Sequence, residues 1–224
     1  MLTGFFKEFT VFMILIIIHE LGHIAASILY NWEIEQIIIL PFGGITIFNE
    51  KINRPLKEEL IIALSGPIFQ ILCYMFLSLF SNNDLVSRLH YVILIFNLLP
   101  IIPLDGSKIC NIFFNYFFSY KRSHILTIYL SIIFMIIFSF KINNNLIMIL
   151  ILLFLILQFL KEVKNHHFYF KKFLLERYLY EFTFKKNKNI IGNNFKKMKR
   201  DYTHTFFIKK EIYNEKEFLK FLFK

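Results

Sequence analysis

The sequence of 224 residues has few cysteines and, over much of its length, few charged residues. Its two cysteines, Cys73 and Cys110, lie in apolar runs and lack the CxxC spacing of a zinc clip or redox pair. We therefore expect small core residues there and no disulfide. Internal repeats are absent, as are the paired broken apolar segments of secondary transporters. The first apolar run lacks a small-residue cleavage site and has charged residues at its centre, so no cleavable signal is predicted.

Apolar residues dominate what is present, since 56% of the chain is hydrophobic and 19% aromatic. A spanning helix needs about 20 mostly apolar residues. We predict an all-α membrane protein, a polytopic helical bundle of five spans over residues 8–30, 60–80, 88–117, 124–140 and 145–161. Pro100, Pro103 and Gly106 interrupt the third span, which should be kinked or unwound near its cytosolic half.

The formal net charge of +10 comes mostly from Lys and Arg near the C-terminus. The positive-inside rule places residues 31–59, 118–123 and everything after 161 in the cytosol. We divide the chain into a membrane domain, 1–161, and a short basic cytosolic tail, 162–224. Beside membrane spans, this charge favours anionic lipid headgroups over nucleic acid, so no nucleic-acid partner is expected.

Two β-rich runs lie between the first two predicted spans, in the segment from Trp32 to Phe48. They flank Pro41, Phe42, Gly43 and Gly44, which are turn residues. We predict a β-hairpin, apolar enough to lie in or against the membrane. The two glycines are expected to supply positive φ angles at the turn.

The most informative motif is HELGH, which places His19, Glu20 and His23 in the middle of the first apolar run. On a helix, the two imidazoles lie one turn apart on one face and can bind one zinc ion, with Glu20 beside them as general base. Ionisable groups at such depth cost several kcal/mol unless they are compensated, and a metal ion would compensate them. The alternatives are a polar helix-packing cluster and a proton relay.

A catalytic zinc ion usually has three protein ligands and one open position. Asp105 carries the only carboxylate within the later apolar spans, in the segment NLLPIIPLDG. The prolines and the following glycine should unwind the helix there and turn the carboxylate toward the bundle axis. In the five-span orientation Asp105 also lies near the depth of the two histidines. The sequence therefore predicts a Zn²⁺ site formed by His19, His23 and Asp105.

HELGH, LPFGG, SGP and NLLPIIPLDG together resemble the site-2 protease family of intramembrane zinc metalloproteases, peptidase family M50. Two further strings, NRPLKEE from Asn53 and FLLERY from Phe173, resemble its subgroup of stage IV sporulation FB proteases. The resemblance implies cleavage of a membrane-associated sigma-factor precursor in the bacterial mother-cell membrane around the forespore, with regulatory membrane proteins as possible partners. It also implies a nucleotide-binding CBS domain at the cytosolic end. The tail is short for a paired CBS module, and residues 199–210 resemble one strand of a truncated remnant.

Two features beside the metal site are candidates for substrate binding. Asn97 resembles a family asparagine near the site and could donate a hydrogen bond to substrate; an interhelical polar contact is an equal alternative. The hairpin, with Phe42, Gly43 and Gly44 at its tip, offers an edge that an unwound substrate could join by strand addition. A hairpin that only seals the bundle is the alternative. Gly66 and Pro67 in the second span favour close helix packing.

Other functions remain open at this point. A divalent-cation or proton transporter would also bury His, Glu and Asp, although the single unrepeated site and the helix-borne base argue against it. A related protease could instead cut an anti-sigma factor or signal-peptide remnants, and a truncated homologue could serve as an inactive binding partner. His90 and His124 lie near span ends, where interfacial imidazoles are ordinary, and neither is assigned to metal.

Overall fold

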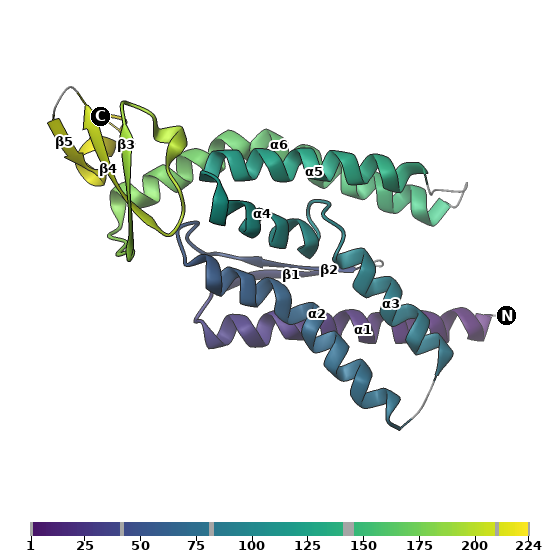
Figure 1. Ribbon diagram of the computed structural model, residues 1–224. Coiled ribbons are helices and arrows are strands. Elements are labelled where there is room, and N and C mark those ends of the chain that lie inside the picture. Colours follow the sequence, from purple (N-terminus) through teal and green to yellow (C-terminus); the bar gives the residue numbers. More distant parts are fainter. Residues whose placement is uncertain (1, 41–42, 81–82, 141–145, 209–210, 224) are drawn as a thin grey trace.

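The computed structural model describes residues 2–40, 43–80, 83–140, 146–208 and 211–223, and it is mostly helical with two small sheets (Figure 1). Its elements, in chain order, are α1 (Leu2–Leu29), β1 (Ile34–Leu40), β2 (Gly43–Phe48), α2 (Leu56–Ser78), α3 (Asp84–Asn97), α4 (Asp105–Phe117), α5 (Tyr120–Phe140), α6 (Leu146–Leu179), β3 (Lys186–Ile191), the 3-10 helix η1 (Phe195–Lys197), β4 (Tyr202–Ile208), β5 (Glu211–Asn214) and α7 (Glu215–Lys220).

Within these residues, 4 helices are long and apolar enough to cross a membrane. They are Phe6–Leu29, Leu56–Ser78, Tyr120–Phe140 and Leu146–Leu179. The third apolar segment, residues 88–117, forms two helices, α3 and α4, of 14 and 13 residues. The predicted interruption is confirmed at residues 98–104, while the count of five spans stays a prediction.

The break between α3 and α4 follows from its two prolines, which cannot donate a backbone hydrogen bond. In an apolar surrounding the backbone groups freed by such a break need other partners. Ser131 on α5 provides them, since its Oγ donates to the Pro100 carbonyl at 3.2 Å and accepts from the Ile102 N–H at 3.3 Å. Apolar side chains around buried Ile101 and Leu104 then pack the break against α5 and α6. The unwound segment is thus a supported part of the bundle.

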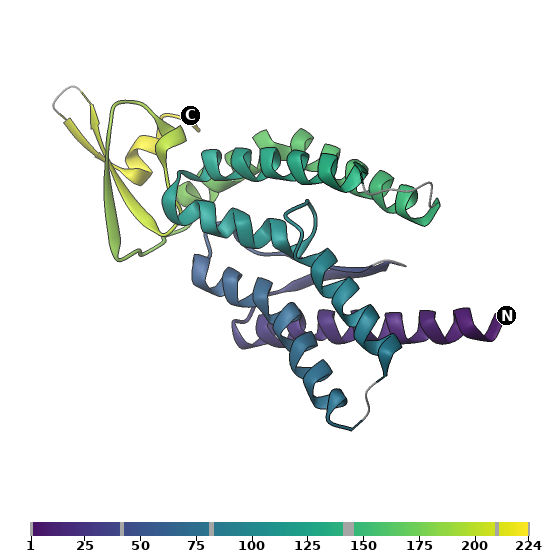
Figure 2. The same ribbon diagram turned by 45° about the vertical axis from the view of Figure 1, so that its right-hand side comes forward.

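The helices form two groups, with the hairpin and α4 between them (Figure 2). Helix α1 packs closely on α2, because a Cβ atom on Gly22 would lie 2.5 Å from the Ser65 carbonyl and 2.9 Å from the Gly66 Cα. Helices α5 and α6 run side by side as the second group, and α4 contacts both α2 and α5. Residues of α1, α2 and α4 are thereby brought to one place.

The predicted hairpin is confirmed, with β1 and β2 paired antiparallel from Ile34↔Phe48 to Leu40↔Gly43. Phe42, predicted at its tip, lies outside the described residues, as does Pro41. The prediction that Gly44 needs a positive φ angle is wrong, since its φ lies outside the left-handed region and the residue pairs with Ile39. Glycine is required at position 44 because a side chain there would collide with α1.

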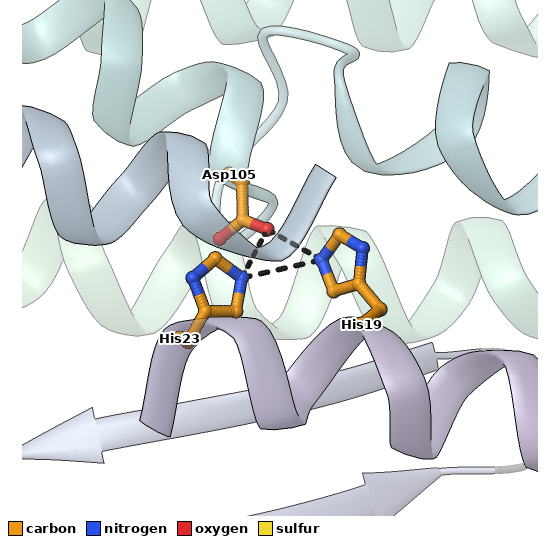
Figure 3. A group of neighbouring side chains, drawn as sticks. All are labelled: His19, His23 and Asp105. Carbon is orange, nitrogen blue, oxygen red and sulfur yellow. Dashed lines mark hydrogen bonds and ion pairs between the residues drawn. The ribbon is translucent and has the colours of Figure 1, made fainter. Parts of the chain in front are cut away.

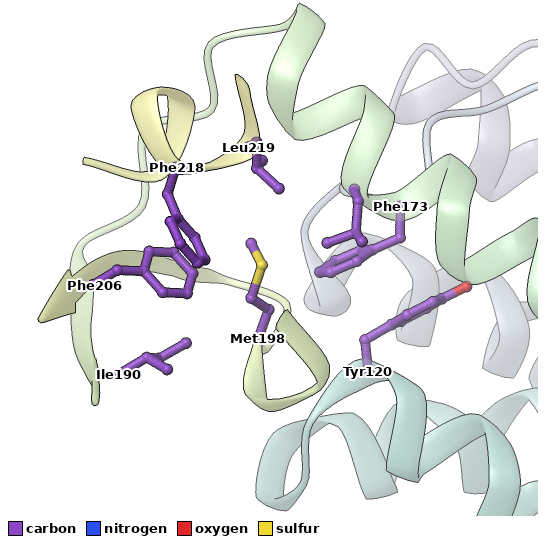
Figure 4. Close-up of a cluster of buried hydrophobic side chains, with 8 residues drawn as sticks. Tyr120, Phe173, Ile190, Met198, Phe206, Phe218 and Leu219 are labelled. Carbon is purple, nitrogen blue, oxygen red and sulfur yellow. The ribbon is translucent and has the colours of Figure 1, made fainter. Parts of the chain in front are cut away.

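The tail contains a three-stranded sheet in the order β3-β4-β5, with β3 parallel and β5 antiparallel to β4. The strand expected within residues 199–210 is confirmed as β4. Side chains of the sheet and α7 share one core with the start of α5 and the end of α6 (Figure 4). Its buried members are Tyr120, Phe173, Leu174, Ile190, Met198, Phe206, Phe218 and Leu219. The tail is therefore packed onto the membrane helices.

A buried polar network ties the segment after the hairpin to α6 and the tail. The Glu176 carboxylate accepts hydrogen bonds from the Ile52 and Asn53 backbone N–H groups, both at 3.1 Å, and from Asn53 Nδ2 at 2.9 Å. Arg177 donates to Asn53 Oδ1 at 2.6 Å, to the Tyr202 carbonyl at 2.7 Å and to Glu215 at 2.8 Å. The network holds the segment that connects β2 to α2.

We predict that Glu176→Ala lowers the free energy of unfolding by about 2–4 kcal/mol, because it leaves buried N–H donors without acceptors. Thermal unfolding of the detergent-solubilised protein measures the change. Glu181→Ala is the matched control, since Glu181 forms an exposed ion pair with Lys216, and exposed pairs contribute little. Equal shifts in the two variants would contradict the structural importance of the network.

Candidate active site

His19 and His23 project from one face of α1, one turn apart, as the HELGH spacing predicts. Their ring centroids are 4.9 Å apart in an edge-to-face arrangement, and both side chains are buried. The two Nε2 atoms are separated by 3.2 Å. The helix thus brings two imidazole nitrogens to one point in the protein interior.

Asp105 is the first residue of α4 and reaches the same point from the opposite side (Figure 3). Its Oδ2 atom lies 2.9 Å from His19 Nε2 and 2.9 Å from His23 Nε2. The break before α4 allows this approach, because the start of α4 folds back against the end of α3. A Cβ atom on Gly106 would lie 2.2 Å from the Leu98 carbonyl oxygen. Ligand atoms of all three residues lie within 4.8 Å of one another.

The outer nitrogens of the two imidazoles show which ring atoms carry protons. His23 Nδ1 is 2.8 Å from the Ile62 carbonyl, and His19 Nδ1 is 2.9 Å from Gln70 Oε1. Gln70 Nε2 donates to the His90 carbonyl at 3.2 Å, which fixes the orientation of the amide. Both Nδ1 atoms therefore donate, and each Nε2 of a neutral ring presents a lone pair.

Two lone pairs on nitrogen and one carboxylate oxygen consequently face each other in a buried space. Three acceptors in such proximity repel one another unless a proton or a cation lies among them. Two histidines and one carboxylate are a common ligand set of catalytic zinc, and a second partner at each outer imidazole nitrogen is the usual arrangement around such a metal. His19, His23 and Asp105 are therefore suited to bind a divalent metal ion.

Glu20, which follows His19 in the chain, is buried, and its carboxylate faces β2. Thr46 Oγ1 donates a hydrogen bond to Glu20 Oε2 at 2.5 Å. A Cβ atom on Gly44 would lie 2.3 Å from Glu20 Oε1, so only glycine leaves room for this carboxylate. Close approach to Glu20, and not turn geometry, explains the glycine at position 44.

A second glycine makes room for a predicted ligand. A Cβ atom on Gly66 would lie 2.2 Å from His23 Nε2. The close helix packing expected at Gly66 is confirmed. The missing side chain leaves room for the His23 imidazole to reach the site. Glu20 and His23 of the HELGH motif thus each face a glycine, Gly44 and Gly66 respectively.

The structure brings together His19, His23 and Asp105, with Glu20 on the adjoining side next to the hairpin. Gly43 and Gly44 lie at the start of β2, and Gly44 contacts Glu20. Asn97 is buried at the end of α3, but among the described residues no hydrogen bond joins its side chain to the histidines or to Asp105. Phe42 lies outside the described residues. The roles assigned to these residues stay predictions.

Four residues near the site were not predicted from the sequence: Thr46, Gln70, His90 and Lys108. His90, expected near a span end, is buried and stacks on Tyr74 with centroids 4.1 Å apart. Gln70 lies four residues after Gly66 on an apolar helix, and this spacing is a signal that could have placed it on the same face. Nothing in the local sequence indicates Thr46.

A cavity of about 360 Å³ adjoins the site on the side of α4. Pro103, Ser107 and Lys108 line it near Asp105, and Phe48 and Lys51 line it from the end of the hairpin. Farther from the site, His124 and Glu162 form a contact of 2.9 Å in its wall. The cavity connects the surroundings of Asp105 with the segment that follows β2.

Known proteins are similar to this chain in sequence and in fold. Residues 8–91 match the model of peptidase family M50. Stage IV sporulation protein FB of Bacillus subtilis (strain 168) is 32% identical over 190 residues, which are 80% of this chain and 66% of that protein. A zinc metalloprotease of Methanocaldococcus jannaschii is 27% identical over 126 residues, which are 51% of this chain and 36% of that protein. The chain therefore spans just under two thirds of the first relative and about a third of the second.

A solved structure is also similar. The site-2 protease from Methanocaldococcus jannaschii superimposes with a TM-score of 0.53 at 26% sequence identity, covering 68% of this chain and 76% of that chain. The matched family region includes HELGH and the hairpin. The resemblance indicated by HELGH and NLLPIIPLDG is confirmed, and the chain belongs to peptidase family M50, with metalloproteases of the site-2 type among its relatives.

Proposed function

We propose that this protein is an intramembrane zinc metalloendopeptidase that hydrolyses a peptide bond of a membrane-associated protein. The observation that carries the proposal is the convergence of three buried acceptor atoms, from His19, His23 and Asp105, beside the buried carboxylate of Glu20. His19, Glu20 and His23 lie on an apolar helix of spanning length, which supports a reaction within the bilayer. Zinc is the metal named in the relative from Methanocaldococcus jannaschii.

His19, His23 and Asp105 would hold the zinc ion through Nε2, Nε2 and Oδ2. A zinc ion at such a site supplies a Lewis acid and lowers the pKa of a water molecule to about 7. Glu20 acts as general base: its carboxylate takes a proton from the attacking water and returns it to the leaving nitrogen. Thr46 leaves Oε1 free for this transfer, because its hydroxyl group holds Oε2.

The hairpin is proposed to present the substrate. A spanning helix has satisfied backbone groups and must unwind before a scissile carbonyl becomes accessible. Strand β2 lies against α1, with Gly44 and Thr46 at Glu20, so a segment added to the hairpin would run close to the general base. Phe42, Gly43 and Asn97 are retained as further substrate-binding candidates.

The identity with stage IV sporulation protein FB supports a more specific proposal. We propose that the substrate is the precursor of a sporulation sigma factor and that the protein acts in the mother-cell membrane around the forespore. The basic tail, residues 162–224, is placed in the cytosol by the positive-inside rule. Regulatory membrane proteins are proposed partners in addition to the substrate and the bilayer.

Coexpression with such a precursor tests the proposed reaction. The parental protein should convert the precursor to a shorter product, as seen on a gel, whereas Glu20→Gln should abolish cleavage and keep bound zinc, because the amide preserves the shape but cannot act as a base. His19→Ala, His23→Ala and Asp105→Ala should instead lose zinc. Cleavage by Glu20→Gln at the parental rate would contradict the mechanism. Cleavage of an anti-sigma factor in place of the precursor would contradict the proposed substrate alone.

Gln70 provides a test of metal binding that does not depend on a substrate. Gln70→Leu removes the acceptor of His19 Nδ1–H and should weaken metal affinity about 10–100-fold, the usual cost of losing such a partner. Competition with a chelator measures the affinity of the purified protein. Gln36→Leu, at an exposed position of β1, is the matched control and should bind metal like the parent. Equal affinities of the two variants would contradict the expectation that Gln70 supports metal binding by His19.

Gly44 tests the contact between the hairpin and Glu20. Gly44→Ala places a methyl group against the carboxylate, so cleavage should fall at least 10-fold, a loss equivalent to about 1.4 kcal/mol of barrier. Bound zinc should stay unchanged. Ile45→Val is the control, because alternate residues of a strand point to opposite faces and position 45 faces away from Glu20. Parental cleavage by Gly44→Ala would show that Glu20 is not constrained by the hairpin.

A further inference from the structure

Lys108 forms a contact with Asp105 that the proposed function does not use. Its Nζ atom lies 3.0 Å from Asp105 Oδ1, in an i,i+3 ion pair on α4. The Asp105 side chain is 8% exposed, and that of Lys108 is 38% exposed along the wall of the adjoining cavity. A lysine therefore directs its charge at a carboxylate that faces two histidines.

The two oxygens of Asp105 consequently have different partners. Oδ2 faces both Nε2 atoms, at 2.9 Å each, whereas Oδ1 accepts from Lys108. A carboxylate can bind a metal ion through one oxygen or through both. Binding through both would take the coordination position that a catalytic metal keeps open for water or substrate.

We propose that Lys108 is a positioning residue that restricts Asp105 to a single oxygen ligand and so keeps one coordination position open. The proposal rests on the proposed metal-dependent function. The ammonium group holds Oδ1 away from the two imidazoles, while Oδ2 remains directed at them. Lys108 thus acts through Asp105 and does not touch the reacting atoms.

Because Lys108 is charged, its removal should change the metal affinity differently from the removal of a neutral partner. A cation beside a metal ligand weakens attraction for a metal ion by Coulomb repulsion. Loss of Lys108 should therefore leave metal bound, at equal or higher affinity, while the second carboxylate oxygen becomes available. This outcome differs from that expected for Gln70→Leu, which removes a neutral hydrogen-bond acceptor and lowers affinity.

Lys108→Met is the most suitable substitution, because methionine keeps an unbranched apolar stem along the cavity wall and removes the charge. Lys108→Gln is a second variant that also removes the charge, for use if the methionine variant does not accumulate in the membrane. Lys108→Arg retains the ion pair and should behave like the parent. Lys57→Met is the matched control, since Lys57 is an exposed lysine near the start of α2.

The full-length proteins are purified in detergent and loaded with Co²⁺, whose visible absorption is strong in four-coordinate sites and weaker at higher coordination. We expect Lys108→Met and Lys108→Gln to bind one Co²⁺ per chain, to show weaker absorption per metal ion, and to lose at least 10-fold in cleavage when loaded with Zn²⁺. Lys108→Arg and Lys57→Met should retain the parental spectrum and cleavage.

An unchanged spectrum in both neutral variants overturns the proposal, whatever their cleavage rates. Loss of bound metal also overturns it, because Lys108 would then be needed to hold Asp105 in place and not to limit its mode of binding. Parental cleavage together with a weaker spectrum shows that the open position does not depend on Lys108. If the parental protein binds Co²⁺ but cleaves no substrate, the proposed protease function fails, and the spectra still test the contact between Lys108 and Asp105.

Discussion

The lone pairs of two imidazoles and one carboxylate point at one another over 2.9 to 3.2 Å in the interior of this protein, and much of the fold serves to hold them there. The imidazoles cannot turn away, because Ile62 and Gln70 on α2 bind their outer nitrogens. The Asp105 side chain is buried at the start of α4, and the second oxygen of its carboxylate accepts from Lys108. An arrangement of acceptors that would be repulsive by itself becomes favourable when a divalent cation binds to it.

Close packing makes this arrangement possible. At Gly66 and Gly44 the absence of a side chain leaves room for His23 and Glu20, respectively. Small residues have a further value in the membrane, where helix association depends on close packing and interhelical hydrogen bonds and not on exclusion of water. The hairpin takes part in the same packing, since Thr46 and Gly44 both contact the Glu20 carboxylate.

The sequence predicted the parts of the site that local spacing determines. HELGH places His19 and His23 one turn apart on any helix, and a lone carboxylate after a helix-breaking segment indicated Asp105. The hairpin and the strand in the tail were also predicted. What could not be predicted depends on contacts between distant segments. The partner of His19 is 51 residues away in the chain, and Thr46 meets Glu20 only because β2 packs on α1. The Glu176 network likewise joins residues more than 100 positions apart, and the packed core joins the start of α5 to α7. The basic composition of the tail does not indicate these contacts.

The central claim is that His19, His23 and Asp105 bind zinc, and the zinc K-edge X-ray absorption spectrum of the purified protein tests it most directly. The account predicts zinc surrounded by nitrogen and oxygen ligands at about 2.0–2.2 Å, with the multiple-scattering pattern of two imidazole rings. Sulfur at about 2.3 Å would contradict it, because Cys73 or Cys110 would then be a ligand. A spectrum without imidazole scattering would contradict it as well.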